Sequence, residues 1–453
     1  MQNHKPIAQK SRRTFLQQTG TIAAAALLSG CTVMLPPVEP STPAPQPEST
    51  STPVPQPTTD PLAAIPLETK IGQMIMVGFA GTKIASNSPL MRDVQLGRIG
   101  GVALFDYNIQ TFEQTKNLIS TLQNGATTPL IVSADQEGGR VQRIGATFGL
   151  ADNFSAQELG TKDIYATHAF AQAIANVLAE AGINLNLAPV VDLNSNPQNP
   201  IIGQLGRSFS ADHNVVSQHA YTFIQAHHDA GVQCTLKHFP GHGSSTTNSH
   251  TEFVDVTNSW REDELFPFSY IINTGRSDAI MTAHIFNAKL DEEYPATLSK
   301  KVLTDTLRQR LNYNGLIITD DMRMGAINDY YGYEKAVELA VLAGVDVIAD
   351  SWYQADRVEA TIRTISNLVQ SGQTSARRID ESYARIMRAK SRIPGHASLV
   401  QPTGQPNPTA TAATMATPTP IPSAMLTPTA APSANTPIPP ETQYYDKLEE
   451  LTE

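Results

Sequence analysis

The sequence predicts a TIM-type (β/α)8 barrel of the α/β class as its one folded unit, with low-complexity flanks on both sides. The chain has 453 residues, and 22 of its 32 prolines lie in two Thr-, Ser- and Ala-rich segments, 36–66 and 402–440. Segments of this composition bury too little apolar surface to fold. The folded unit is therefore expected over residues 67–394, and a length of about 330 residues suits an α/β barrel.

Short apolar runs alternate with helical patterns along this unit, as parallel βαβ units require. Strands are predicted for eight runs, the number that a closed barrel needs: 74–79, 101–105, 130–134, 184–188, 233–236, 279–282, 316–319 and 345–349. The most regular helix is expected over residues 166–181, where apolar residues recur at three- and four-residue steps until Gly182. A last helix is expected over residues 375–390.

Polar side chains follow five of these strands at the point where each strand ends. They are Asp135 after the third strand, Asp192 and then Arg207 beyond the fourth, Lys237 and His238 after the fifth, His284 after the sixth and Asp320 after the seventh. The carboxyl ends of parallel strands meet at one end of a barrel, which is where barrel enzymes carry their active sites. General loop polarity explains one or two such positions better than it explains five.

The N-terminal segment predicts export and attachment to a membrane. Residues 1–30 contain Ser11-Arg12-Arg13-Thr14-Phe15-Leu16, which resembles a twin-arginine signal, and an apolar stretch too short to span a bilayer. They end in Leu28-Ser29-Gly30-Cys31, which resembles a bacterial lipobox, so we expect a lipoprotein anchored through Cys31 that faces outside the cytoplasm. A plain secretory signal with an incidental cysteine is the alternative. Residues 31–66 would then be a linker and residues 395–453 a low-complexity tail.

Charge and cysteine content narrow the possible partners. The formal net charge is −10, from 32 Lys and Arg against 42 Asp and Glu, which argues against a nucleic-acid partner. Cys31 and Cys234 are the only cysteines, so lipidation of Cys31 leaves Cys234 without a disulfide partner.

A series of short motifs along the unit resembles glycoside hydrolase family 3, in its single-domain bacterial β-N-acetylhexosaminidase branch. In order, they are Asp135-Gln136-Glu137-Gly138-Gly139-Arg140-Val141-Gln142-Arg143, Leu187-Ala188-Pro189-Val190-Val191-Asp192, Gly206-Arg207-Ser208-Phe209, Lys237-His238-Phe239-Pro240-Gly241-His242-Gly243 with Ser249-His250, Met281-Thr282-Ala283-His284, and Ile318-Thr319-Asp320-Asp321-Met322. Each motif alone is short, and the order of all of them carries the resemblance.

The resemblance implies a retaining exo-glycosidase that needs no cofactor. Asp320 matches the nucleophile that forms a covalent glycosyl-enzyme, and Asp321, its rival, is expected to face elsewhere and cap the following helix. The acid/base matches His250 on a mobile loop, and an imidazole can donate and retrieve a proton near neutral pH. An exposed loop histidine is the structural alternative.

The resemblance also implies which residues hold the sugar. The matching positions are Asp135, Arg143, Arg207, Lys237 and His238, with Asn248, His284 and Asp192 expected to support the site. The alternative for each cation is a structural pairing with a buried acid. The implied substrate is an oligosaccharide that ends in β-linked N-acetylglucosamine, such as a fragment of peptidoglycan or chitin.

One position departs from the family pattern. Asn248 stands two residues before His250, where the family has an aspartate. An amide orients an imidazole but supplies no negative charge, so we expect a lower pKa for His250 and weaker protonation of the leaving group than a carboxylate would give. Glu252 could substitute from the other side of the loop.

Three competing interpretations remain. A metal site at His238, His242 and His250 is disfavoured because Phe239-Pro240-Gly241 prevents the helix that would put the first two on one face. An anchored saccharide-binding pseudo-enzyme is suggested by Asn248. A β-glucosidase would share the fold and differ in its substrate.

Overall fold

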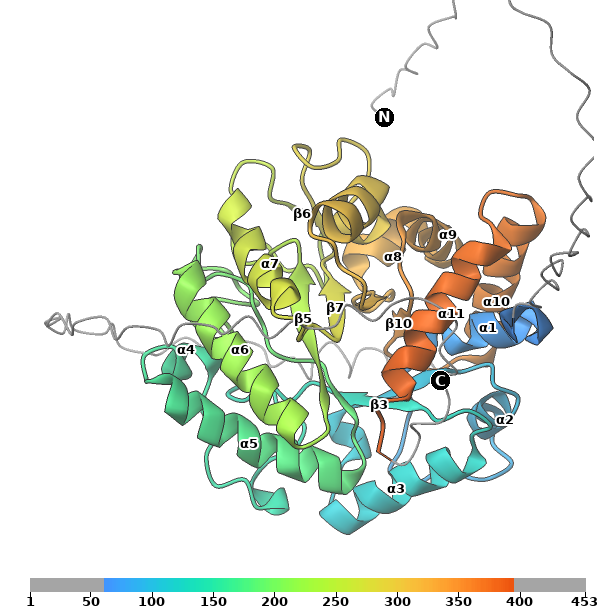
Figure 1. The fold of residues 1–453 in the computed structure, drawn as a ribbon, viewed down its shortest axis with the longest axis horizontal. Coiled ribbons are helices and arrows are strands. Elements are labelled where there is room, and N and C mark those ends of the chain that lie inside the picture. Colours follow the sequence, from blue (N-terminus) through green and yellow to red (C-terminus); the bar gives the residue numbers. More distant parts are fainter. Residues whose placement is uncertain (1–60, 395–453) are drawn as a thin grey trace, which may run out of the picture. The chain divides into compact units, whose positions relative to one another are not determined.

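Eight parallel strands form a barrel within residues 61–394, the part of the chain that the computed structural model describes (Figure 1). The strands are β1 Ile75–Val77, β2 Gly101–Leu104, β3 Ile131–Ala134, β4 Leu185–Asn186, β5 Gln233–Phe239, β7 Ala279–Thr282, β9 Leu316–Ile318 and β10 Ile348–Asp350. The predicted export signal, Cys31, the linker and the C-terminal tail lie outside the described residues.

The barrel is nearly closed. The strands follow the order β10-β1-β2-β3-β4-β5-β7-β9, and each neighbouring pair is parallel. At the seam, a parallel bridge joins Ile318 to Val347, the residue before β10. Backbone hydrogen bonds of 3.0 Å run across the seam from Val347 N to Ile317 O and from Thr319 N to Val347 O. The predicted (β/α)8 fold class is confirmed.

Each of the eight predicted runs overlaps one barrel strand, and the fifth strand extends furthest beyond its predicted end. β5 continues three residues past the predicted end at Leu236, because Phe239 pairs with Thr282 of β7 and Lys237 bridges to Val190. Lys237 and His238 were expected after this strand and instead lie within it.

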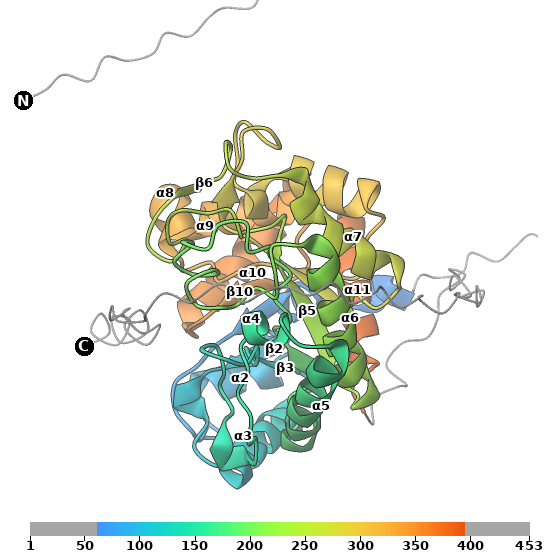
Figure 2. The ribbon, with the colours of Figure 1, turned by 90° about the vertical axis from the view of Figure 1, so that its left-hand side faces the viewer.

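Helices surround the barrel in both views (Figures 1 and 2). They are α1 Leu67–Gln73, α2 Pro89–Gln95, α3 Phe112–Gly125, α4 Ala156–Leu159, α5 Ile164–Ala181, α6 His213–Asp229, α7 Phe266–Asn273, α8 Gly325–Tyr331, α9 Tyr333–Ala343, α10 Ala355–Gln370 and α11 Ala376–Lys390, with a π-helix at Lys301–Arg310. α5 ends at Gly182, as predicted, and the φ of +93° at this residue explains why glycine stands there. None of the described helices is long and apolar enough to cross a membrane.

The core fills the space between strands and helices, and it determines where polar groups gather. Strand residues such as Met76, Val102 and Val132 are almost completely buried. At the carboxyl ends of the strands, polar residues replace the apolar ones and line a cavity. A two-stranded parallel ribbon, β6 Val254–Asp255 with β8 Ile285–Phe286, joins the segment after β5 to the segment after β7 beside this end of the barrel.

Candidate active site

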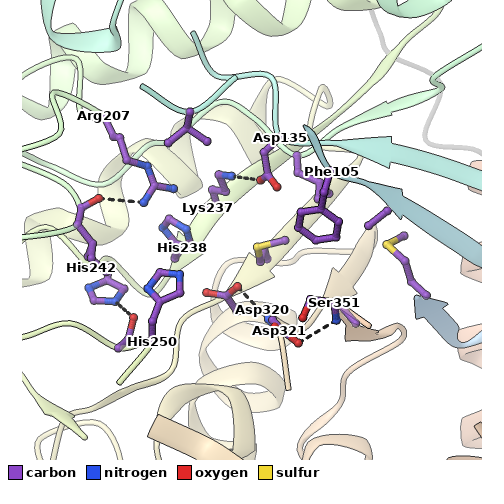
Figure 3. A pocket seen from close by; sticks show the side chains of 18 of the residues that line it. Phe105, Asp135, Arg207, Lys237, His238, His242, His250, Asp320, Asp321 and Ser351 are labelled. Carbon is purple, nitrogen blue, oxygen red and sulfur yellow. Dashed lines mark hydrogen bonds and ion pairs between the residues drawn. The ribbon is translucent and has the colours of Figure 1, made fainter. Parts of the chain in front are cut away.

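A cavity of about 90 Å³ lies at the carboxyl ends of the barrel strands (Figure 3). The structure brings all of the predicted catalytic and sugar-binding residues to its wall: Asp135, Arg143, Arg207, Lys237, His238, His250 and Asp320. The apolar part of the wall includes Met76, Phe105 and Leu187. Ion pairs and imidazoles beside an apolar surface give a small pocket that can hold both the hydroxyl groups and the carbon face of a polar ligand.

Asp320 follows β9 and points into this cavity (Figure 3). Its Oδ1 accepts a hydrogen bond of 2.9 Å from the backbone N–H of Asp321. Burial alone would raise the pKa of Asp320, but the imidazoles of His284, His238 and His250 outweigh burial and lower that pKa below its usual value. The carboxylate is therefore ionised at neutral pH, the state that the expected role of nucleophile requires.

Asp321 also lines the cavity, which corrects the expectation that it faces elsewhere and caps the next helix. α8 begins only at Gly325, beyond the reach of a cap from Asp321. The Oδ1 atom of Asp321 instead accepts hydrogen bonds of 3.0 Å from the backbone N–H groups of Arg323 and Ser351. Its Oδ2 atom has no hydrogen-bond partner among residues 61–394. Asp321 thus connects the end of β9 to the end of β10.

His250 reaches the cavity from the loop between β5 and β6. The side-chain Oδ1 of Asn248 accepts from the His250 backbone N–H at 3.0 Å and lies 2.8 Å from His250 Nδ1. An amide oxygen can only accept, so Nδ1 carries the proton in this contact and Nε2 is the other ring nitrogen. Asn248 therefore orients the imidazole without supplying a charge.

A buried ion network forms the wall opposite this loop (Figure 3). Lys237 Nζ lies 2.6 Å from Asp135 Oδ1 and 2.6 Å from Glu137 Oε1, and Arg207 grips Glu137 with two hydrogen bonds of 2.8 and 2.9 Å. Burial would raise the pKa of Asp135, but Lys237 and Arg143 lower it to about 2. Lys237, Arg207 and Arg143 are thus each paired with an acid of this network, as the alternative interpretation expected. They nevertheless line the cavity and supply it with hydrogen-bonding groups.

Asp192 holds two histidines of the cavity wall in place. The carboxylate is completely buried, and its Oδ2 lies 2.7 Å from His238 Nδ1. Its Oδ1 accepts from the backbone N–H groups of His238 and His242 at 3.0 and 2.8 Å. Asp192 therefore fixes both the ring and the backbone of the segment that carries His238.

His284 also supports the site, from the segment after β7. Its Nδ1 lies 2.7 Å from Thr297 Oγ1, and its Nε2 lies 2.9 Å from the backbone oxygen of Asp321. Burial lowers the pKa of His284, although Asp320 acts in the opposite direction. The imidazole thus contacts the backbone of the turn that carries Asp320.

Three residues of the site received no role in the sequence reasoning. Glu137 is bound by both buried cations, and His242 and Asp350, the last residue of β10, line the cavity. Burial and the charge of Asp321 raise the pKa of Asp350 to about 6. A signal for Glu137 exists, since it stands two residues after Asp135, and alternate residues of extended chain point the same way.

The three histidines that suggested a metal site are held by other partners. His238 contacts Asp192, His242 lies between two serines, and His250 contacts Asn248. Within residues 61–394, no group of three His, Cys, Asp or Glu side chains is arranged to hold a metal ion.

A parallel barrel that gathers ionisable side chains around a cavity at the carboxyl ends of its strands has the architecture of a barrel enzyme. The chain belongs to glycosyl hydrolase family 3: the model of the glycosyl hydrolase family 3 N terminal domain matches residues 66–389.

The sequence is also similar to bacterial β-hexosaminidases and to a solved β-N-acetylglucosaminidase of family 3. Beta-hexosaminidase A of Pseudoalteromonas piscicida is 35% identical over 65% of this chain and 54% of its own length, and the beta-hexosaminidase of Tolumonas auensis is 38% identical over 55% and 75%. The solved family 3 β-N-acetylglucosaminidase of a Paenibacillus species has a TM-score of 0.67 and 33% identity over 76% of this chain and 65% of its own. The chain thus spans just over half of the Pseudoalteromonas protein.

Proposed function

We propose that this protein is a retaining exo-β-N-acetylhexosaminidase that removes terminal β-linked N-acetylglucosamine from oligosaccharides. The observation that carries the proposal is that Asp320 and His250 reach one cavity from different elements, the end of β9 and the β5–β6 loop. The names of the relatives support the same substrate class, because they include beta-hexosaminidases and a β-N-acetylglucosaminidase.

In the first step, a carboxylate oxygen of Asp320 attacks the anomeric carbon and forms a covalent glycosyl-enzyme. The bond to the leaving sugar breaks, and protonated His250 gives its Nε2 proton to the departing oxygen. In the second step, the neutral imidazole takes a proton from water, which attacks the same carbon and releases Asp320. Asp135, Lys237 and the neighbouring cations hold the ring hydroxyls during both steps.

Trapping the intermediate tests this mechanism. A 5-fluoro N-acetylglucosaminyl derivative with a good leaving group, which keeps the 2-acetamido group, should label the purified protein, and mass spectrometry should locate the adduct on Asp320. Asp320→Asn should abolish both labelling and turnover, whereas Asp321→Asn should keep the adduct on Asp320. An adduct on Asp321 would reassign the nucleophile. Saccharide binding without any adduct would favour the pseudo-enzyme that Asn248 suggests.

Substrate choice needs its own assay. We expect p-nitrophenyl N-acetyl-β-glucosaminide to be cleaved with a much higher kcat/KM than the corresponding glucoside. A preference for the glucoside would replace the proposal with a β-glucosidase. Chitobiose and a muropeptide that ends in N-acetylglucosamine then distinguish the two natural sources of the sugar.

We further propose that the protein is exported and anchored by lipid on Cys31, because Arg12-Arg13 and the Leu28–Cys31 motif stand in the order that such signals require. Radiolabelled palmitate should label the parent protein in cells, and Cys31→Ser should lose the label and leave the membrane fraction. Membrane attachment that survives this substitution would contradict the anchor.

A further inference from the structure

We propose that His242 is a positioning residue that holds His250 in register with the nucleophile by clamping Ser249, the residue directly before His250. The inference rests on the proposed function, in which His250 protonates the leaving group. It adds a residue that acts on the acid/base through another side chain.

The geometry of the clamp lies within a single loop. His242 Nδ1 lies 2.6 Å from Ser245 Oγ, and His242 Nε2 lies 3.0 Å from Ser249 Oγ. The imidazole thus joins the start of the loop to the residue before its functional tip. His242 and Ser249 are each 1% exposed, so water does not compete for these hydrogen bonds.

Two hydroxyl partners suit a neutral imidazole, because one serine can accept from its N–H group while the other donates to its bare nitrogen. The surroundings favour this state. Burial first, and then the charge of His238, lower the pKa of His242 to about 4, although Asp192 and Asp320 act in the opposite direction. The clamp is therefore intact across the neutral pH range in which a glycosidase with an imidazole acid/base works.

The base of the clamp is itself fixed to the barrel. The His242 backbone N–H donates to Asp192 at 2.8 Å, and Asn199 Nδ2 donates to the backbone oxygen of His242 at 2.8 Å. Asn196 Nδ2 holds the backbone oxygen of Ser245 at 2.7 Å. The backbone at His242 and Ser245 is thus fixed by hydrogen bonds to residues 192–199, and the imidazole connects this fixed part of the loop to Ser249.

The far side of the loop rests on the helix that follows the nucleophile. The backbone oxygen of His250 accepts from Gly325 N at 2.9 Å, and that of Ser249 accepts from Ala326 N at 3.4 Å, both in the first turn of α8. Ser249 is therefore held from two directions, by its hydroxyl on His242 and by its carbonyl on α8. Without the hydroxyl contact, Ser249 would keep only its carbonyl bond to α8.

A positioning role makes a prediction that a purely structural role does not. Protonation by an acid matters most for a poor leaving group and little for one that departs unaided. Misplacing His250 should therefore slow the cleavage of chitobiose far more than that of 2,4-dinitrophenyl N-acetyl-β-glucosaminide. Damage to the fold or to the sugar-binding wall would lower both rates together.

The test uses Ser249→Ala in the full-length protein, with Ser249→Thr to restore the hydroxyl and Thr246→Ala as an exposed control in the same loop. We expect Ser249→Ala to lower kcat/KM, which reports the first step alone, by roughly 10- to 100-fold on chitobiose and by less than about threefold on the dinitrophenyl substrate. Ser249→Thr should recover most of the loss, and Thr246→Ala should match the parent on both substrates.

Two results would overturn the clamp: an equal loss on both substrates, or no loss on chitobiose. Neither result touches the proposed function. That function fails separately if the parent protein releases N-acetylglucosamine neither from chitobiose nor from the muropeptide nor from the p-nitrophenyl glycoside, or if cleavage survives Asp320→Asn. His242→Phe, which keeps a ring but removes both nitrogens, provides a second variant that should reproduce the leaving-group pattern if Ser249→Ala folds poorly.

Discussion

Replacing Asn248 with aspartate changes a single charge beside His250, the proposed acid/base. Asn248 Oδ1 already accepts from both the backbone and the ring of His250, at 3.0 and 2.8 Å. An aspartate side chain at this position keeps that oxygen and replaces only the amide nitrogen with a second oxygen. The substitution Asn248→Asp therefore leaves the orienting contacts in place and adds the charge that the family pattern supplies.

The expected effect follows from Coulomb's law. Two unit charges about 4 Å apart interact by about 1 kcal/mol in water and about 4 kcal/mol near a protein surface. His250 is half-buried, so an attraction of about 1.5–3 kcal/mol is reasonable, which raises the pKa of His250 by about one to two pH units relative to the parent. A raised pKa keeps the imidazole protonated to higher pH. The alkaline limb of the pH–rate profile therefore moves upward, and its acid limb is unaffected by this group.

The measurement is kcat/KM for chitobiose from pH 5 to pH 10 in the parent and in Asn248→Asp. On the alkaline side of the optimum we expect a gain of up to about tenfold in the variant, with little gain on a dinitrophenyl substrate. Thr246→Asp places the same charge on an exposed residue of the loop and serves as the control. An alkaline limb that stays in place, or that moves equally in the control, would refute the reasoning.

Three further substitutions probe the surroundings of the site. Glu137→Gln leaves two buried cations short of one charge and should lower the free energy of unfolding by about 2–4 kcal/mol in urea titrations, with a raised KM; unchanged stability would contradict the ion network. Burial and Asp192 raise the pKa of Glu264 to about 8, so the parent should lose stability as pH rises from about 5 to 8, and Glu264→Gln should remove this slope from thermal melts, whereas an equal slope in both proteins would refute it. A Cβ at Gly325 would lie 3.2 Å from the backbone oxygen of His250, so Gly325→Ala should lower kcat severalfold with a nearly unchanged Tm, and a kcat equal to the parent's would show that the loop yields freely.

Much of the barrel was predictable because its signals are local. The eight apolar runs, the periodicity of α5 and the cap at Gly182 each reflect a preference that a few neighbouring residues determine. The end of β5 was not predictable in this way, since Phe239 joins the strand only through its pairing with β7. Strand ends depend on the partner strand, which the local sequence does not contain.

The residues of the site were also predictable where the signal is local and not where it depends on distant contacts. The positions of Asp135 and Asp320 at strand ends indicated which end of the barrel carries polar groups. The role expected of Asp321 was wrong because a preference for helix caps is local, whereas Ser351, its actual partner, lies 30 residues away. His242 was noticed only as a possible metal ligand, because its contacts with serines depend on how the loop folds back on itself.

The contacts of the β5–β6 loop determine how often it is displaced. Among the contacts that hold the segment around His250 are three hydrogen bonds: Ser249 Oγ to His242, and the backbone oxygens of Ser249 and His250 to α8. At about 1 kcal/mol each, they give the displaced state a free energy about 3 kcal/mol above the seated one, which is a population of about 1%. An oligosaccharide that enters only past a displaced loop therefore meets an open site about 1% of the time, which lowers its association rate constant about a hundredfold, and any substitution that loosens these contacts speeds entry while it impairs protonation.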